Sequence, residues 1–373
     1  MKQFTMAAAV LLSLLLIGFN QPSKGNQFGG REQGAYNGAV IWRGFEEQWG
    51  YNHRLNRMGD FVKFSDQNAS EFNADVTHAA ASGSGSDTAT FRSYFTEISS
   101  PDVGFQSGST NFEVTGKEDE TISMAIPVSV PAEMAVKNRG IYQVILNGFD
   151  MCAKSDAKKP VFFHLGVGDV KYDNTTNKIN LQVFLNLRVD CKSVECKPLD
   201  KNVDYNMTVN YLVLAGDNGK FASTSGAFDT AYSWDDKHEI FFKPKQESIA
   251  GVGGAFPFAA LGLSAIQVDL HGTDQWMVEW NSAVRPAEYN PQTGKQNFDL
   301  DLFFKQWNAL TSLKLVSFTK PGAADWSANV VLFQFKDARI VHKENVDSIP
   351  WDATGGGSCV EAATKTSHIT FNK

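Results

Sequence analysis

Apolar and polar residues alternate along several segments of the chain, as they do in strands with one face against a core. The clearest segment is 179–189, in which every odd position is apolar and only Phe184 interrupts the polar positions. A second apolar segment, 206–216, precedes an Asp-Asn-Gly sequence at 217–219, which is typical of tight hairpin turns. Only 131–140, with a proline at its start and a glycine at its end, has the pattern of a short helix. The pattern therefore predicts an all-β fold with few short helices.

Several segments resemble later segments of the chain, in the same order. Four matches share apolar, glycine, tyrosine or lysine positions at offsets of 124, 117, 119 and 119 residues. They relate 143–150 to 267–274, 172–178 to 289–295, 179–185 to 298–304, and 209–214 to 328–333. A weaker match relates 40–46 to 144–150, at an offset of 104. Because chance matches have no reason to follow one order, the sequence predicts an internal repeat.

The matches divide the chain into a leader and three consecutive units. The predicted ranges are a signal peptide at 1–25, β-sandwich unit 1 at 26–128, unit 2 at 129–250 and unit 3 at 251–373. An immunoglobulin-like sandwich needs about 100 residues, so each range is long enough to bury its own core. We therefore expect a tandem of jelly-roll or Ig-like β-sandwich units, internally repeated, with unit 1 the weakest copy. A single large sandwich built from duplicated halves is the alternative.

Two stretches that are rich in small residues predict interruptions of the strands. Residues 77–90 are mainly Ala, Gly, Ser and Thr, and we expect a mobile loop there, inside unit 1. Residues 251–254 include three glycines and fall where units 2 and 3 should meet.

The amino terminus has the features of a secretory signal peptide. Lys2 supplies a positive charge, and 7–17 is an uncharged apolar run interrupted only by Ser13. This run is shorter than the roughly 20 apolar residues that span a bilayer, and no later segment is long enough either, so no transmembrane segment is predicted. We expect the protein to be secreted, periplasmic or located at the cell surface.

Four cysteines in an exported chain predict a disulfide framework, for which three pairings are open. Cys191 and Cys196 are close enough in sequence to close a short loop, which would leave Cys152 to pair with Cys359. The sequence has neither the paired C-x-x-C spacing nor the nearby histidine pair of a zinc site, so the cysteines predict no metal site.

Charge and motifs disfavour several classes of function. The chain has 34 Lys and Arg against 41 Asp and Glu, a net charge of −7, which disfavours a nucleic-acid partner. The serine-nucleophile, phosphate-loop, dinucleotide and H-E-x-x-H motifs do not occur in the sequence, so we predict no cofactor and no metal. Asp299 and Asp301, on one face of a predicted strand, suit a solvated surface better than a calcium site. Adjacent acids such as Glu46 and Glu47 leave glycoside hydrolysis as the least excluded enzymatic activity.

Aromatic residues, with 28 Phe, 9 Tyr and 8 Trp, distinguish the composition. Most should lie in the core, whereas Phe184 and Phe303 are either covered or exposed as platforms. Two segments place tryptophan beside amides and carboxylates, the groups that can stack on sugar rings and hydrogen-bond their hydroxyls. The candidate ligand-binding residues are Trp49, Tyr51, Asp274, Gln275, Trp276, Glu279 and Trp280. Strand edges with buried tryptophans are the alternative interpretation.

Taken as hypotheses about function, these patterns favour an exported binding protein without catalytic residues. Its partner is expected to be a carbohydrate, which is the leading ligand class, or another surface protein. The first alternative is a structural protein that self-associates into a homo-oligomer through strand edges or aromatic faces. The second alternative is a carboxylate-dependent glycoside hydrolase.

Overall fold

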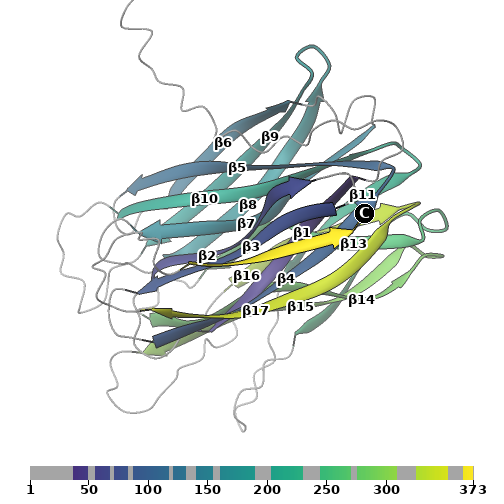
Figure 1. The fold of residues 1–373 in the computed structure, drawn as a ribbon. Coiled ribbons are helices and arrows are strands. Elements are labelled where there is room, and N and C mark those ends of the chain that lie inside the picture. The colour runs from purple at the N-terminus through teal and green to yellow at the C-terminus, as the bar shows by residue number, and fades with distance from the viewer. Residues whose placement is uncertain are drawn as a thin grey trace, which may run out of the picture.

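The computed structural model of the protein describes twelve stretches of the chain, and the structural statements below concern these stretches. They are residues 37–48, 55–67, 71–82, 87–116, 121–131, 140–153, 160–189, 203–229, 244–269, 275–308, 325–351 and 364–372. Within them the chain forms eighteen strands and no helix (Figure 1). Every pairing between these strands is antiparallel. The predicted all-β fold is confirmed, while most of the short helix predicted at 131–140 lies outside the described residues.

The strands are described here in three consecutive sets of six. The first set is β1 (Asn37–Gln48), β2 (Leu55–Gln67), β3 (Glu71–Ser82), β4 (Asp87–Ser100), β5 (Val103–Gly116) and β6 (Ile122–Pro131). The second set is β7 (Ile141–Ala153), β8 (Pro160–Asp173), β9 (Lys178–Val189), β10 (Val203–Gly216), β11 (Phe221–Asp229) and β12 (Lys245–Ala250). The third set is β13 (Phe258–Asp269), β14 (Gln275–Asn290), β15 (Lys295–Asn308), β16 (Asp325–Phe335), β17 (Arg339–Trp351) and β18 (Thr364–Asn372).

The strand pairings recur when every strand number is advanced by six. Within the sets, β1–β4 becomes β7–β10 and β13–β16, and β2–β3 becomes β8–β9 and β14–β15. Between the sets, β5–β10 becomes β11–β16 and β17–β4, while β6–β9 becomes β12–β15 and β18–β3. The pairing β2–β7 likewise becomes β8–β13 and β14–β1. The third set therefore closes onto the first.

These pairings give one 6-stranded sheet and one 12-stranded sheet. The first sheet has the order β12-β15-β14-β1-β4-β17. The larger sheet contains a second sheet, β18-β3-β2-β7-β10-β5, and a third sheet, β6-β9-β8-β13-β16-β11. The second and third sheets are joined through β7 and β13 by the single residue pair Leu146 and Leu263. Each of the three sheets therefore has the same order and takes strands from all three sets.

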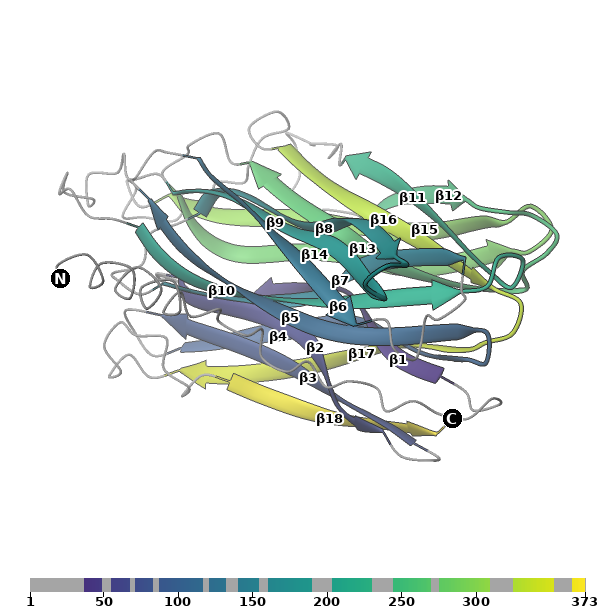
Figure 2. The same cartoon turned by 90° about the horizontal axis from the view of Figure 1, so that it is seen from above.

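The sheets pack face to face, in a sandwich-like arrangement (Figures 1 and 2). β1 packs against β2, and β17 packs against β3, so parts of the first and second sheets form two layers. The predicted boundary between 128 and 129 falls inside β6, and that between 250 and 251 falls at the end of β12. The division into separate sandwich units and its origin in a repeat stay predictions, because the pairings connect all three predicted ranges.

A bulge near the middle of β1 and β7 aligns the sets with one another. We call two residues corresponding when one lies on the strand six numbers after the strand of the other and the residues paired opposite them are related in the same way. Gly44 lies opposite Ala283 on β14, and Gly148 lies opposite Phe61 on β2. The same pairing on β13 involves Ala265, so Gly44, Gly148 and Ala265 correspond. This register gives an offset of 117 between β7 and β13, not the 124 of the sequence match between 143–150 and 267–274.

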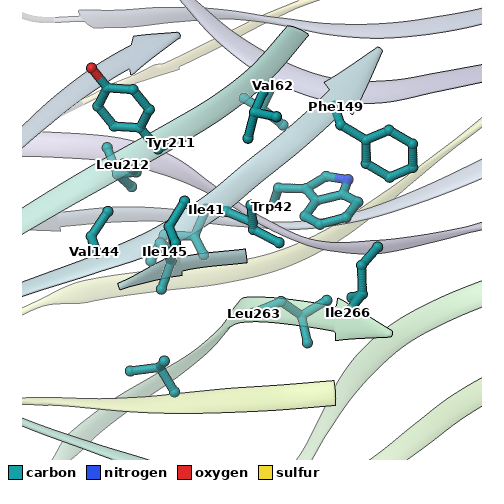
Figure 3. Close-up of a cluster of buried hydrophobic side chains, with 14 of the residues drawn as sticks. Ile41, Trp42, Val62, Val144, Ile145, Phe149, Tyr211, Leu212, Leu263 and Ile266 are labelled. Atoms are coloured by element: carbon teal, nitrogen blue, oxygen red, sulfur yellow. The ribbon is translucent and has the colours of Figure 1, made fainter. Parts of the chain in front are cut away.

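Large apolar side chains fill the space where the central strands of the three sheets meet. Figure 3 shows Trp42 and Phe149 pointing into this cluster, and both rings are buried. The ring centroids of Trp42 and Phe45 are 6.2 Å apart, and those of Phe45 and Phe149 are 5.9 Å apart. Because β1, β7 and β13 all contribute to one contiguous core, its apolar burial stabilises the three sets together.

The expected mobile loop at 77–90 is wrong for most of its length. β3 continues to Ser82 and β4 begins at Asp87, so only 83–86 lie outside the described residues. β3 pairs with β2 on one side and β18 on the other, and this pairing satisfies backbone groups that a loop would expose. The run of small side chains therefore did not indicate a loop, because a strand that is hydrogen-bonded to a neighbour on each side needs no large side chains to stay in the sheet.

The predicted strands and turns on either side of the centre agree better with the structure. β9 covers the whole alternating segment 179–189, and β10 covers 206–216. The turn after β10 has Gly219 at a φ of 84°, a conformation that glycine adopts without strain. The glycine-rich residues 251–254 form part of the connection between β12 and β13, as the sequence predicted.

Candidate functional site

Four of the predicted ligand-binding residues belong to β14, and the other three lie outside the described residues. Outside the described residues are Trp49, Tyr51 and Asp274, while β14 contains Gln275, Trp276, Glu279 and Trp280. The side chain of Trp280 is the one among them that the structure describes. A second pair of adjacent acids beside an aromatic residue, Asp235 and Asp236 after Trp234, also lies outside the described residues.

Trp280 belongs to the core and is removed from the ligand-binding candidates. Its residue is 2% exposed, and its ring centroid lies 5.6 Å from that of Phe45 and 5.3 Å from that of Phe163. Its indole N–H donates a hydrogen bond to the hydroxyl of Ser282 over 2.8 Å. A sugar can stack only on a ring with an open face, and neighbouring aromatic rings cover this one.

The two predicted segments flank strands that are direct neighbours in the first sheet. β1 ends just before Trp49, β14 begins just after Asp274, and the two strands pair with Gln48 opposite Glu279. In the next pair of strands, Trp276 on β14 lies opposite Trp307 on β15. The sequence placed these segments in different units, whereas the pairing brings their strands together at one end of one sheet.

Charged side chains continue across the same sheet from this end. They come from five neighbouring strands, and we call them, together with one tyrosine, the charged row: Asp301, Arg285, Glu46, Tyr94, Arg92 and Glu344. Phe45, next to Glu46, is buried in the core. Since successive strand residues point to opposite faces, the charged row lies on the face away from that core.

Arginines and carboxylates alternate along the charged row. Arg285 lies 3.4 Å from the Asp301 carboxylate and 3.7 Å from that of Glu46. Arg92 lies 3.7 Å from Glu46 on one side and 3.7 Å from Glu344 on the other. The side chain of Asp301 is 14% exposed and that of Glu344 is 54% exposed, so the row runs from a half-buried end to a solvated one.

Tyr94 connects the two arginines at the centre of the row. Its hydroxyl donates a hydrogen bond to Glu46, and the Arg285 guanidinium lies 5.7 Å from the centroid of its ring. Burial and then the hydrogen bond to Glu46 raise the pKa of Tyr94 well above its ordinary value, so the hydroxyl remains a donor at neutral pH.

Arg43 supports the row from the bulge of β1. It is 2% exposed and donates to the carbonyl oxygens of Val284 at 2.6 Å and Phe95 at 3.1 Å. A longer contact of 3.4 Å reaches the carbonyl of Lys343. Burial lowers the pKa of Arg43 to about 10, which still leaves it charged at neutral pH. Arg43 therefore ties β1 to its neighbours β14 and β4 and to β17 beyond β4.

The corresponding positions of the third sheet carry no charge. Glu46 and Arg92 are opposite each other on the first sheet, and Gln267 and Ser327 are the corresponding pair on the third. At the positions of Tyr94 and Glu344 the third sheet has Asn329 and Ala227. The third sheet therefore lacks the charged row, and the strand pairings do not require it.

The described side chains include no group of three or more His, Cys, Asp or Glu placed to hold a metal ion. In the charged row each of the three carboxylates has an arginine as its neighbour. Such a set presents N–H donors and carboxylate acceptors side by side, which suits the recognition of a polar ligand.

The sequence did not identify most of the charged row. Glu46 and Asp301 were considered as acids, but nothing distinguished Arg92, Tyr94 or Arg285 from other surface residues. Their partners come from strands far apart in the chain, so only the pairing of β1 with β14 and β4 brings them together. The one usable signal was the acid that follows a Gly-Phe pair in β1 and β7.

Phe184 is neither fully covered nor an open platform. It is half-buried, its ring lies over Gly166, and its ring centroid is 5.0 Å from that of His164. The side chain of Phe303 is outside the described side chains. The two phenylalanines also do not correspond, because the register places Asp301 at the position of Phe184.

Cys152 lies near the end of β7, where it is buried and disulfide-bonded. Cys191, Cys196 and Cys359 lie outside the described residues, so the pairing of the four cysteines stays a prediction.

In the part of the chain that is described, no helix is long and apolar enough to cross a membrane. Comparison of the chain with protein-family models, curated proteins and solved structures identified no match.

Proposed function

We propose that the protein is an exported, non-catalytic binding protein whose ligand is a carbohydrate, bound at the first sheet. The proposed site comprises the charged row and the end of β14 that carries Trp276. Arg92, Arg285 and Tyr94 would supply donors to sugar hydroxyls, and Glu46 and Glu344 would supply acceptors.

One observation carries this proposal. The two segments with tryptophan, amide and acid residues flank β1 and β14, which are paired, and the charged row crosses these same strands. A sugar needs an aromatic face for its apolar C–H groups together with several polar groups for its hydroxyls. In this proposal the tryptophans of the two segments supply the aromatic face, and the charged row supplies the polar groups.

The contrast between the sheets supports a binding role for the row over a purely structural one. The pair of Arg92 with Glu344, at the solvated end of the row, is of the exposed kind that contributes only about 0–1 kcal/mol to stability, so the fold does not need it. The third sheet keeps the same strand order with uncharged residues at the corresponding positions. Charges that the fold does not require are available for recognition.

The test is to screen the full-length protein on a glycan array and to measure the affinity of any bound sugar by calorimetry. Trp276→Ala and Arg92→Ala should each weaken binding by about tenfold, equivalent to about 1.4 kcal/mol. Ser327→Ala is the matched control, because Ser327 corresponds to Arg92 on the third sheet, and it should leave the affinity unchanged.

Two outcomes would contradict the proposal. One is the absence of binding across the array by folded protein. The other is a bound sugar whose affinity is unaffected by Trp276→Ala and Arg92→Ala, which would place the site elsewhere on the molecule.

A further inference from the structure

The outer edge of β5 is a long strand edge that no described strand covers. β5 lies at the end of the second sheet, and β10 is its neighbour there along the full length from Val103 to Gly116. Such an edge presents a row of backbone N–H and C=O groups, which can pair with a strand of another chain.

β5 lacks the features that protect the corresponding edge of the first sheet. That edge is β17, which contains a proline, Pro350, and charged residues that include Lys343 and Glu344. β5 has the same kind of position in its sheet but contains no proline and a single charged residue, Glu113. Charges and prolines along an edge oppose pairing with another chain, so the second sheet is open to pairing where the first is not.

The centre of β5 also has an unused hydrogen-bond donor above it. A Cβ added at Gly108 would lie 2.3 Å from the hydroxyl oxygen of Tyr211, so the tyrosine extends across the glycine. Figure 3 shows the Tyr211 hydroxyl pointing away from the apolar cluster around its ring. Tyr211 is 5% exposed, and its hydroxyl has no hydrogen-bond partner among the described residues.

We propose that β5 pairs with β5 of a second copy of the chain, in antiparallel orientation, around a twofold axis at Gly108. A twofold contact uses the same surface on both copies and closes at two, so it gives a dimer and not a fibre. The axis is perpendicular to the joined sheet, so one residue of β5 must lie opposite the same residue of the second copy. Gly108 is the smallest residue available, and its place under Tyr211 brings both tyrosine hydroxyls to the axis.

This register matches the side chains of β5 with one another. Ser107 faces Ser109 of the second copy, and Gln106 faces Thr110, so uncharged polar residues meet on both sides of the axis. Glu113 faces Val103, so no like charges are opposed across the contact. The dimer joins two copies of the second sheet and leaves the charged row of the first sheet free, so it is independent of the proposed carbohydrate site.

The register can be tested with charges at the facing serines, using the full-length protein in sedimentation equilibrium. Wild type should sediment as a dimer. The pair Ser107→Lys with Ser109→Lys places lysine opposite lysine twice and should give the monomer mass. The pair Ser107→Lys with Ser109→Glu places lysine opposite glutamate twice and should restore the dimer mass.

The matched control uses the corresponding edge of the third sheet. Ser225→Lys with Ala227→Lys adds the same charge to β11 at the positions that correspond to Ser107 and Ser109, and it should leave the dimer intact. If the double lysine variant fails to fold by circular dichroism, Gln106→Lys with Thr110→Lys tests the same register. A monomeric wild type at all concentrations, or a dimer that survives lysines at both facing pairs, would overturn the proposal.

Discussion

The first and third sheets have the same strand order and the same pairings, yet they present different chemistry at corresponding positions. Where the first sheet has Asp301 and Glu46, the third has Phe184 and Gln267. At these positions the first sheet joins strands through ion pairs, whereas the third lays the ring of Phe184 over Gly166. Strand pairing and the buried core therefore set the architecture, and the outer positions are free to differ.

The difference extends to the bulge, where the backbone itself differs. Gly44 on the first sheet has a φ of 107° and lies against β14, while Ala265 occupies the corresponding position on the third. Arg43, just before the bulge glycine, corresponds to Ser264. The first sheet thus combines a glycine-dependent bulge, a buried arginine and a charged row.

The largest expected effect is that of Gly44→Ala. A Cβ added there would lie 1.8 Å from the Ser282 carbonyl oxygen, and the φ of 107° is strained for any residue except glycine. We expect the unfolding free energy to fall by about 3 kcal/mol or more, since backbone strain and a clash with backbone atoms add together. Urea denaturation measures this change.

The matched change at the third sheet is Ala265→Gly. Ala265 already has a Cβ, so its removal should cost only about 1 kcal/mol, the usual cost of glycine within a strand. If Gly44→Ala lowered the unfolding free energy by no more than Ala265→Gly, the bulge of β1 would not depend on glycine. The two sheets would then not differ at this position.

The second effect in size is that of Arg43→Met. The substitution keeps much of the side-chain volume but leaves the Val284 and Phe95 carbonyl oxygens without their donor inside the protein. Each buried acceptor left unsatisfied costs about 1–3 kcal/mol, so we expect a loss of about 2–3 kcal/mol in urea denaturation. Ser264→Ala is the control, because its single contact of 3.5 Å to Asn329 is long, and it should cost less than about 1 kcal/mol.

The sequence was sufficient for local structure and insufficient for long-range pairing. The alternation over 179–189 and the turn at 217–219 were predictable because strand faces and tight turns depend on neighbouring residues. The pairing of β5 with β10 in the second sheet was not predictable, because β10 belongs to another set of strands and no local pattern encodes this pairing. The sequence left the burial of Trp280 open for the same reason, because its covering rings come from β1, β7 and β8.

The candidate site could likewise be predicted from the sequence only in part. Tryptophan, amide and acid residues near β14 were visible in the sequence as a cluster of suitable side chains. Arg285 and Arg92 could not be identified as site residues, because each is placed there by its ion pair with Glu46, which lies on the strand between theirs. A short match such as that of 143–150 to 267–274 can also be displaced by several residues along a strand. The register of β7 opposite β2 and of β13 opposite β8 gives an offset of 117 instead.

The smallest expected effect concerns the pH dependence of stability, to which a histidine on the third sheet and another on the first both contribute. Burial lowers the pKa of His164 below the ordinary histidine value of about 6.5, so the folded protein binds this proton less readily than the unfolded chain. The stabilising contribution is therefore complete above the unfolded pKa and decreases as the pH falls through and below about 6.5. His342, whose pKa is lowered to about 4 by burial and by Arg43, contributes a slope of the same sign.

We expect His164→Gln to remove part of the loss of stability between pH 7 and pH 5, while leaving the stability at pH 7 nearly unchanged. Urea denaturation at both pH values measures the difference. Arg92→Ala provides the contrast, because an exposed ion-pair residue should alter the dependence on salt concentration and leave the His164 contribution in place. If His164→Gln left the pH dependence unaltered, the aromatic contact on the third sheet would not hold the histidine in its neutral form.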